Sequence, residues 1–197
     1  ENRLEKAQAL MHFYQIDIFL ITTEQFMRYF TGFSTQFWQS PTRPWYLLIP
    51  LKGSPKAVIP EIGFSAMQKT WIKEIYTWPS PRSEDEGVSL ISKVIKEIPS
   101  KFNNIGAELG KEMSLRMPLT DFFLLQSTLS RKIIDASSIL WELRLIKSNA
   151  EIEKIKHICK IASNSFGNLP SLIKEGDSER DIAKKMKIDL ISRGAEN

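Results

Sequence analysis

The sequence is poor in the residues that most often bind metals or form disulfides. It contains one cysteine, Cys159, and two histidines, His12 and His157. One cysteine cannot form an internal disulfide, so we expect a reducing, cytoplasmic location. His157 and Cys159 stand two positions apart, and on a helix their side chains would point in different directions. We therefore predict no metal ligand in this chain and interpret both histidines as structural or surface residues.

Long hydrophobic runs and dense blocks of charge are also absent. The longest apolar stretches, such as residues 45–49, are far shorter than the roughly 20 residues of a membrane helix. Residues 1–6 are charged and contain no apolar signal core. The net charge of +4 comes from 27 basic and 23 acidic residues that are spread along the chain. We expect no membrane span, no secretion signal and no nucleic-acid partner.

The common nucleotide-binding and hydrolase signatures are missing as well. The chain contains no GxGxxG, Walker, GxSxG or HExxH motif, so no local motif identifies a reaction. It has the composition of a folded protein, because 42% of its residues are hydrophobic and 10% are aromatic. Its 197 residues accommodate one full domain and part of a second.

Hydrophobic spacing alternates between helix and strand periods through residue 145. The predicted helices cover residues 4–11, 24–30, 62–71, 88–98 and 118–126, and the predicted strands cover residues 16–21, 33–38, 45–49, 56–60, 75–78, 105–109 and 132–135. Ser83 and Glu86 have the spacing of a capping box at the start of the fourth helix. This alternation predicts a layered α/β domain over residues 1–145.

The pattern changes at residue 146, after which only helices are predicted. Ser148 and Glu151 form a capping box before one apolar helix face, and Ser178 with Asp181 begins a second helix. This helical hairpin is too short to bury its apolar faces alone. We therefore expect that a second domain begins at residue 146 and is truncated.

The connection between the aromatic residues Phe37 and Trp45 is the most unusual stretch. Loops carry binding residues more often than cores do. An aromatic face suits a cationic group and a guanidinium suits a carboxylate, so Trp38 and Arg43 are the candidate substrate-binding residues. The structural alternative is that Trp38 and Trp45 cover the sheet and that Arg43 is a surface charge. We interpret the acidic run 84–86 as a helix N-terminus, where carboxylates offset the macrodipole.

Four motifs resemble the creatinase, prolidase and aminopeptidase P family, the pita-bread metallopeptidases. Tyr-Phe-Thr-Gly-Phe at residues 29–33 resembles an element near the family's start. Leu-Arg-Leu-Ile-Lys-Ser-x-x-Glu-Ile at residues 143–152 resembles its interdomain hallmark, and this match is the specific one. Residues 175–182 are similar to the turn after the first catalytic-domain helix, and Gly194-Ala195 to the point before its first strand.

The resemblance implies a ribonuclease-H-like, creatinase-type N-terminal domain of three layers with a mixed sheet, over residues 1–145. Residues 146–197 would be the first two helices of a truncated pita-bread domain. The family holds two divalent metal ions, Mn, Zn, Co or Fe, with two Asp, one His and two Glu that lie beyond Asn197. The resemblance therefore assigns no catalytic or metal residue here, and we expect this fragment to be inactive alone.

The implied role is that of the non-catalytic part of a metal-dependent Xaa-Pro dipeptidase or aminopeptidase, which gates small peptide substrates and forms a homodimer. In creatinases an aromatic residue and an arginine at comparable places contact the substrate carboxylate. Three extra residues, Ser40, Pro41 and Thr42, separate Trp38 from Arg43 relative to that pattern. The alternatives are a creatinase-like C–N hydrolase, a dimethylsulfoniopropionate lyase acting on a small cationic carboxylate, and a metal-free binding module.

Overall fold

A computed structural model of the protein describes residues 2–40 and 43–196. The chain forms two compact units, Glu1–Leu145 and Ile146–Asn197. The helices of the first unit are α1 (Asn2–Phe13), α2 (Glu24–Thr31), α3 (Phe64–Met67), α4 (Val88–Glu97), α5 (Leu119–Thr128) and α6 (Ser137–Leu145), with the 3-10 turns η1 (Gln36–Gln39) and η2 (Glu61–Gly63). Its strands are β1 (Ile18–Ile21), β2 (Tyr46–Pro50), β3 (Lys56–Pro60), β4 (Glu74–Trp78), β5 (Asn104–Ala107) and β6 (Lys132–Asp135).

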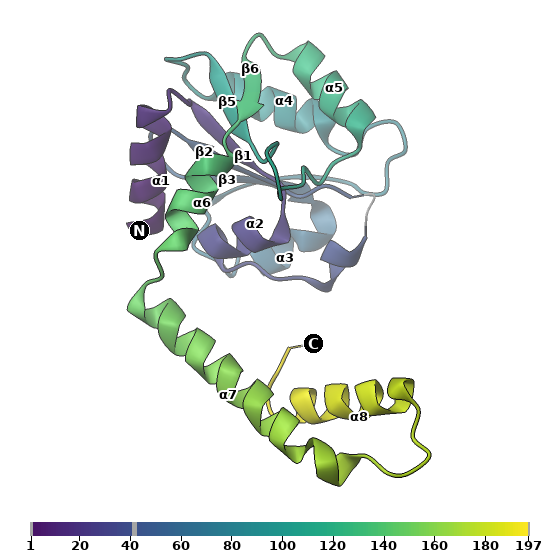
Figure 1. The fold of residues 1–197 in the computed structure, drawn as a ribbon. Helices are drawn as coiled ribbons and strands as arrows, with labels where there is room; N and C mark the ends of the chain where they lie inside the picture. Colours follow the sequence, from purple (N-terminus) through teal and green to yellow (C-terminus); the bar gives the residue numbers. More distant parts are fainter. Residues whose placement is uncertain (1, 41–42, 197) are drawn as a thin grey trace. The chain divides into compact units, whose positions relative to one another are not determined.

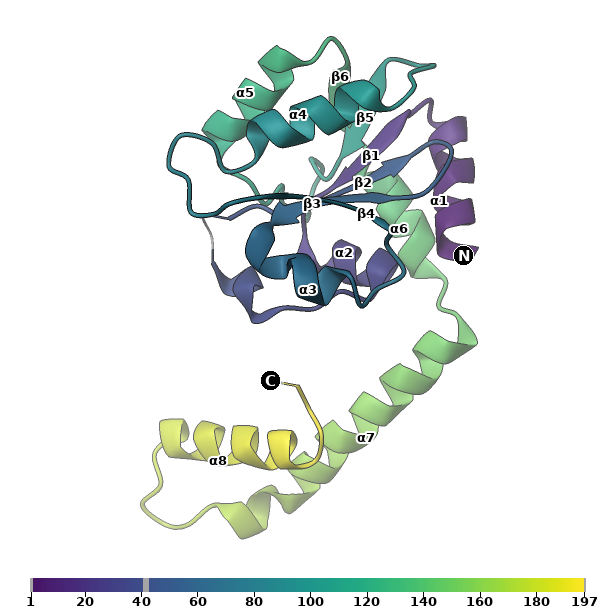
Figure 2. The same ribbon diagram turned by 180° about the vertical axis from the view of Figure 1, so that it is seen from behind.

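The six strands form one mixed sheet in the order β4-β3-β2-β1-β5-β6. Strand β2 runs antiparallel to both of its neighbours, and the other three pairings are parallel. Helices lie on both faces of the sheet (Figures 1 and 2). The predicted α/β class with a mixed sheet is confirmed.

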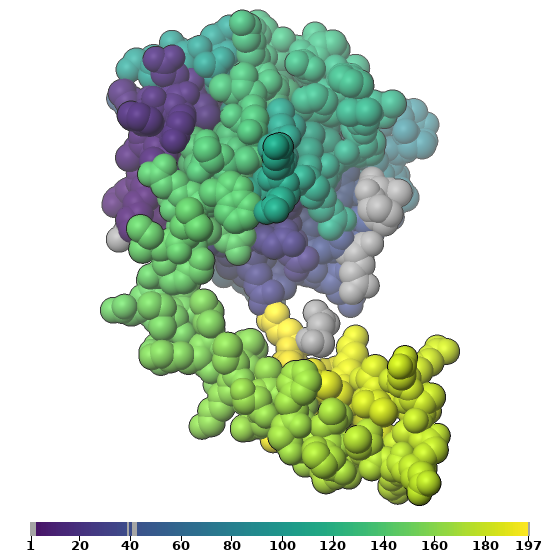
Figure 3. Space-filling model, in the orientation of Figure 1, coloured from purple at the N-terminus to yellow at the C-terminus, as the bar shows by residue number. Residues whose placement is uncertain are grey.

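Alternation along the strands divides the core into two clusters. In β1, Phe19 and Ile21 pack with α1, α2, α3 and α6, whereas Ile18 and Leu20 pack with α4 and α5. This division follows from the two-residue period of a strand, which sends successive side chains to opposite faces. Helix α6 packs beside α1 and is visible next to it on the surface of this unit (Figure 3).

Three local predictions are wrong. Residues 33–38 do not form a strand; they end in the η1 turn, where the Thr35 hydroxyl accepts a hydrogen bond from the N–H of Phe37. The predicted helix 62–71 is only the short turn η2 followed by α3. The capping box at Ser83 does not form, because α4 begins after Gly87 and the Glu86 carboxylate binds other donors. Helix α6 lies at residues 137–145, where the hydrophobic spacing predicts no helix.

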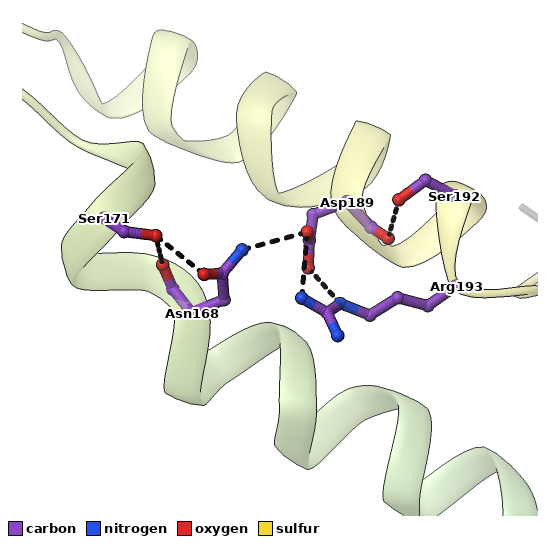
Figure 4. A network of polar contacts seen from close by, with 5 residues as sticks. All are labelled: Asn168, Ser171, Asp189, Ser192 and Arg193. Carbon is purple, nitrogen blue, oxygen red and sulfur yellow. Dashed lines mark hydrogen bonds and ion pairs between the residues drawn. The ribbon is translucent and has the colours of Figure 1, made fainter.

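The second unit is a pair of helices, α7 (Asn149–Leu172) and α8 (Glu179–Ser192). Both predicted capping boxes are confirmed, at Ser148 and at Ser178. A polar network joins the two helices (Figure 4). Asn168 Nδ2 donates to Asp189 Oδ1 at 3.1 Å, and Arg193 Nε donates to Asp189 Oδ2 at 2.6 Å. Over the described residues, no helix combines the length and the apolar character needed to cross a membrane.

Candidate functional site

The sheet brings separate parts of the chain to one edge. Because β1, β3, β4, β5 and β6 are parallel, their carboxyl ends meet at the same edge, together with the start of β2. We call this the carboxyl edge; it contains Thr22 after β1, the end of β4 at Trp78, Glu108 after β5 and Tyr46 at the start of β2. Ligand sites of open α/β sheets lie outside this edge, where the strand order changes direction.

A buried carboxylate joins two strand ends at the carboxyl edge. Glu108 is fully buried, and its Oε2 accepts hydrogen bonds from the backbone N–H groups of Thr22 at 2.6 Å and Thr23 at 3.1 Å. The hydroxyls of both threonines also donate to this carboxylate. Burial raises the pKa of Glu108, and the hydrogen bonds oppose that shift without cancelling it. Because all four hydrogen bonds come from the two residues that precede α2, Glu108 holds the N-terminus of α2 against β5.

An arginine connects this carboxylate to the segment that carries Trp38. The N–H of Arg116 donates to Thr22 Oγ1 at 2.9 Å, and its Nη2 donates to the Ser40 carbonyl at 2.8 Å. The Arg116 guanidinium carbon lies 5.7 Å from the centre of the Trp38 ring. A cation over an aromatic face at this distance is attractive. The Arg116 guanidinium thus faces the Trp38 ring from within the same chain.

Trp38 itself lies in the core. Its side chain is 3% exposed, and its ring centre is 6.4 Å from that of Phe33 and 5.6 Å from that of Trp45. The structure places this candidate where the structural alternative expects it, among residues that cover the sheet. Trp45 is fully buried in the same cluster.

Arg43, the second candidate, is half-buried and lies near Glu86. Burial tends to raise the pKa of Glu86, but hydrogen bonds and the positive charge of Arg43 hold it below its usual value. The donors are Trp78 Nε1 at 3.0 Å, the Ser80 hydroxyl at 2.8 Å and the Arg82 N–H at 2.7 Å. The positive charge of Arg43 thus acts on a fixed carboxylate at the carboxyl edge.

The two candidates stand on either side of residues that the structure does not describe. Pro41 and Thr42, two of the three residues that lengthen this segment relative to the creatinase pattern, lie outside the described residues. Sequence reasoning did not find Glu108 or Arg116. A signal existed for Glu108, because an acidic residue directly after a buried strand belongs to the edge where ligands and polar contacts gather. Arg116 had no comparable signal, since its partners are distant in sequence.

The described residues do not suit a metal ion. No group of three or more His, Cys, Asp or Glu side chains among residues 2–40 and 43–196 could hold one. In the acidic run 84–86, Glu86 is bound by internal donors, and Asp85 Oδ1 accepts the N–H of Ser89 at 3.2 Å in the first turn of α4. Both of these acidic side chains thus accept hydrogen bonds from donors of the same chain.

Comparisons with known proteins agree on one kind of domain. A family model described as the Creatinase/Prolidase N-terminal domain matches residues 3–146. A protein named Uncharacterized peptidase YqhT, from Bacillus subtilis (strain 168), is 25% identical over 197 residues, which are 99% of this chain and 50% of that protein. The chain therefore spans about half the length of the curated relatives it matches.

Solved structures share the fold. The match to the Xaa-Pro dipeptidase from Bacillus anthracis has a TM-score of 0.79 at 20% identity and covers 100% of this chain and 50% of that chain. The Creatinase/Prolidase N-terminal domain of an X-Pro dipeptidase from Streptococcus pyogenes matches with a TM-score of 0.57 at 13% identity, over 72% of this chain and 98% of that chain. At these identities the likeness is one of fold alone.

Proposed function

The chain belongs to the creatinase/prolidase N-terminal domain family, and we propose that it is the non-catalytic, substrate-gating and dimerising part of a metal-dependent Xaa-Pro dipeptidase or aminopeptidase. The observation that carries this proposal is the family match over residues 3–146 together with a peptidase relative of which the chain covers half. In this proposal the enzyme works in the cytoplasm on small peptides.

Residues 146–197 would be the first two helices of the catalytic pita-bread domain. Two observations support this assignment: the second unit begins at Ile146, and the match to the Bacillus subtilis relative extends over 99% of the chain, beyond the N-terminal domain model. In the proposal, residues outside this sequence hold two divalent metal ions, Mn, Zn, Co or Fe. When bound, such ions activate water for attack on the scissile carbonyl.

The gating role is assigned to Arg43. Arg43 is half-buried at the carboxyl edge, and its positive charge acts on the Glu86 carboxylate, which three donors hold in place. A guanidinium is able to bind the carboxylate of a peptide through paired, charge-assisted hydrogen bonds. Trp38 would act indirectly, because its side chain is buried in the core.

The cationic-carboxylate alternatives gain no support from the structure. They depend on an open aromatic face for a cationic group, and Trp38 packs against Phe33 and Trp45 with the Arg116 guanidinium over its ring. The peptide hypothesis needs only a cation for the substrate carboxylate, which Arg43 supplies.

The first experiment reads the source gene beyond codon 197 and looks for the ordered ligand set Asp, Asp, His, Glu, Glu. If the set is present, the full-length protein is assayed with Mn, Zn, Co or Fe on Xaa-Pro dipeptides, with dimethylsulfoniopropionate and creatine as comparison substrates. We expect cleavage of the dipeptides, and none by residues 1–197 alone. A gene without the ligand set would favour the metal-free binding module.

Arg43→Ala in the full-length protein tests the gating assignment. A hydrogen bond to a charged group contributes about 1.5–3 kcal/mol, so KM should rise roughly 10- to 150-fold while kcat changes little. Lys73→Ala is the control, because Lys73 is an exposed cation just before β4, at the opposite edge of the sheet. An unchanged KM in Arg43→Ala would remove Arg43 from the site.

A further inference from the structure

Helix α5 exposes apolar residues that a folded domain normally covers. Its inner side chain Leu125 is fully buried, but Leu119, Phe123 and Leu124 on its outer side are 66%, 58% and 50% exposed. We call these three residues the outer stripe of α5. Polar residues such as Thr120 and Ser127 are exposed on the same side of α5, but three large apolar side chains exposed on one short helix still indicate an interaction site.

A groove runs beside this stripe, between α5 and α4. The two helices are held side by side by a hydrogen bond of 3.0 Å between the hydroxyls of Ser92 and Thr128. The groove has a volume of about 480 Å³, with Leu124 in its wall and Lys93 and Lys96 along α4. Glu97 and three hydroxyl residues, Ser89, Ser92 and Thr128, also line it, so the groove has mixed walls with one more positive than negative charge.

The charges of this face are separated from end to end. Both helices connect a carboxyl strand end to the amino end of the next strand, so their N-termini lie at the carboxyl edge and their C-termini at the opposite edge. The N-terminal end carries Glu84, Asp85 and Asp121. Burial and the negative charges of Asp85 and Glu86 raise the pKa of Asp121, which is consistent with an excess of carboxylates here.

Positive charge dominates the other end. Lys93 and Lys96 are exposed on the last turns of α4, where Glu97 offsets only one of them. At the N-terminal end, Arg43 and Arg82 offset part of the charge of the acidic run, but carboxylates remain in excess. The face thus has an acidic end, an apolar middle and a basic end.

We propose that this α4–α5 face is the surface on which a second copy of the chain docks, about a two-fold axis that crosses α5 at right angles. Such an axis makes the two α5 helices antiparallel. It places the apolar stripe of one copy on that of the other, and the acidic end of each copy against the basic end of its partner. The proposal rests on the dimerising role proposed above and specifies where that role is located.

The opposite orientation is unfavourable for an electrostatic reason. With the axis parallel to α5, the acidic ends of the two copies would lie at the same end of the interface. Lys93 and Lys96, on α4 helices at opposite sides of the α5 pair, would then have no acidic end opposite them. The charge pattern therefore selects the antiparallel arrangement, while the apolar stripe supplies most of the affinity through burial.

Sedimentation equilibrium of residues 1–197 over about 1–100 µM tests the proposal, with the tryptophan emission of each variant checked for a folded first unit. We expect a dimer whose Kd rises ten-fold or more in Phe123→Ser. Ile62→Ser is the matched control, because Ile62 is 53% exposed but lies in η2, away from α5. Lys96→Glu should weaken the dimer, and adding Glu84→Lys to the same chain should restore it.

The outcomes separate this inference from the proposed function. A wild-type dimer that neither Phe123→Ser nor Lys96→Glu weakens would overturn the α4–α5 face while leaving the dimerising role in place. A wild-type chain that stays monomeric at about 100 µM would overturn both. If Lys96→Glu weakens the dimer but Glu84→Lys fails to restore it, the antiparallel arrangement is wrong.

Discussion

Replacing Glu108 by alanine is expected to lower the free energy of unfolding of the first unit by about 4 kcal/mol. The substitution removes the acceptor of two buried backbone N–H groups, those of Thr22 and Thr23, whose side chains are at most 6% exposed. A buried donor without a partner costs about 1–3 kcal/mol, so two cost about 2–6 kcal/mol. The two threonine hydroxyls lose the same acceptor but are able to rotate towards others.

Glu108→Gln is the matched control. A glutamine carbonyl at the position of Oε2 would keep three of the four hydrogen bonds, and its amide group is able to donate to the Thr23 hydroxyl. We therefore expect a loss of only about 1 kcal/mol at pH 7. Urea unfolding followed by tryptophan emission reports on the first unit alone, because all five tryptophans lie in it.

The pH dependence supplies a second test of Glu108. Because burial raises its pKa above the ordinary 4.5, the folded protein retains a proton at pH values where the unfolded chain has lost it. The stability contributed by Glu108 is thus present below pH 4.5 and declines as the pH rises through the folded-state pKa. The wild type should lose stability relative to Glu108→Gln over that interval. Equal unfolding energies for the alanine and glutamine variants would refute the reasoning.

Three further substitutions test other parts of the structure. Asp17 accepts hydrogen bonds from three backbone N–H groups, which lower its pKa against the opposing effect of burial. Asp17→Asn should therefore lower the free energy of unfolding by about 2 kcal/mol at pH 7. In urea titrations this difference from the wild type should shrink as the pH falls below 3.8. Gly87 has φ +88°, and a Cβ there would lie 2.7 Å from the Trp78 ring, so Gly87→Ala should lower the free energy of unfolding by about 3 kcal/mol. Gly32→Ala should lower it by only about 1 kcal/mol, because Gly32 has φ +74° but open space around it. Similar losses for the two variants in urea unfolding would contradict the steric argument. Ser148→Ala should destabilise the first turn of α7 by about 1 kcal/mol. The measurement is amide exchange, which should become faster in this turn than in the wild type while exchange in α8 stays unchanged.

The sequence identifies those features whose partners are neighbours in the chain. The capping boxes at Ser148 and Ser178 form as predicted because donor and acceptor are three residues apart. Gly32 ends α2 in a left-handed conformation. Glycine adopts this conformation readily because it has no Cβ, so the residue type by itself indicates the helix end. The alternation of strand and helix periods likewise predicts the α/β class, since each period follows from the geometry of its own segment.

Contacts that reach beyond the spacing of a local motif decide the rest. Ser83 and Glu86 have capping-box spacing, yet the Trp78 indole and the Ser80 hydroxyl bind the Glu86 carboxylate, so no box forms. Thr23 begins α2, but its hydroxyl donates to Glu108 and makes no local cap. A favourable local spacing is overridden when a tertiary partner offers stronger or more numerous hydrogen bonds.

The sequence by itself determined the α/β class, most of the helices and strands, the capped hairpin and the family to which the first domain belongs. Each of these depends on local hydrophobic periods and short motifs. Only the tertiary structure decided that Trp38 is buried, that the charge of Arg43 acts on Glu86, and that Glu108 joins Thr22 across 86 positions of the chain. The order and direction of the strands bring those residues to one edge, and no local spacing encodes that order.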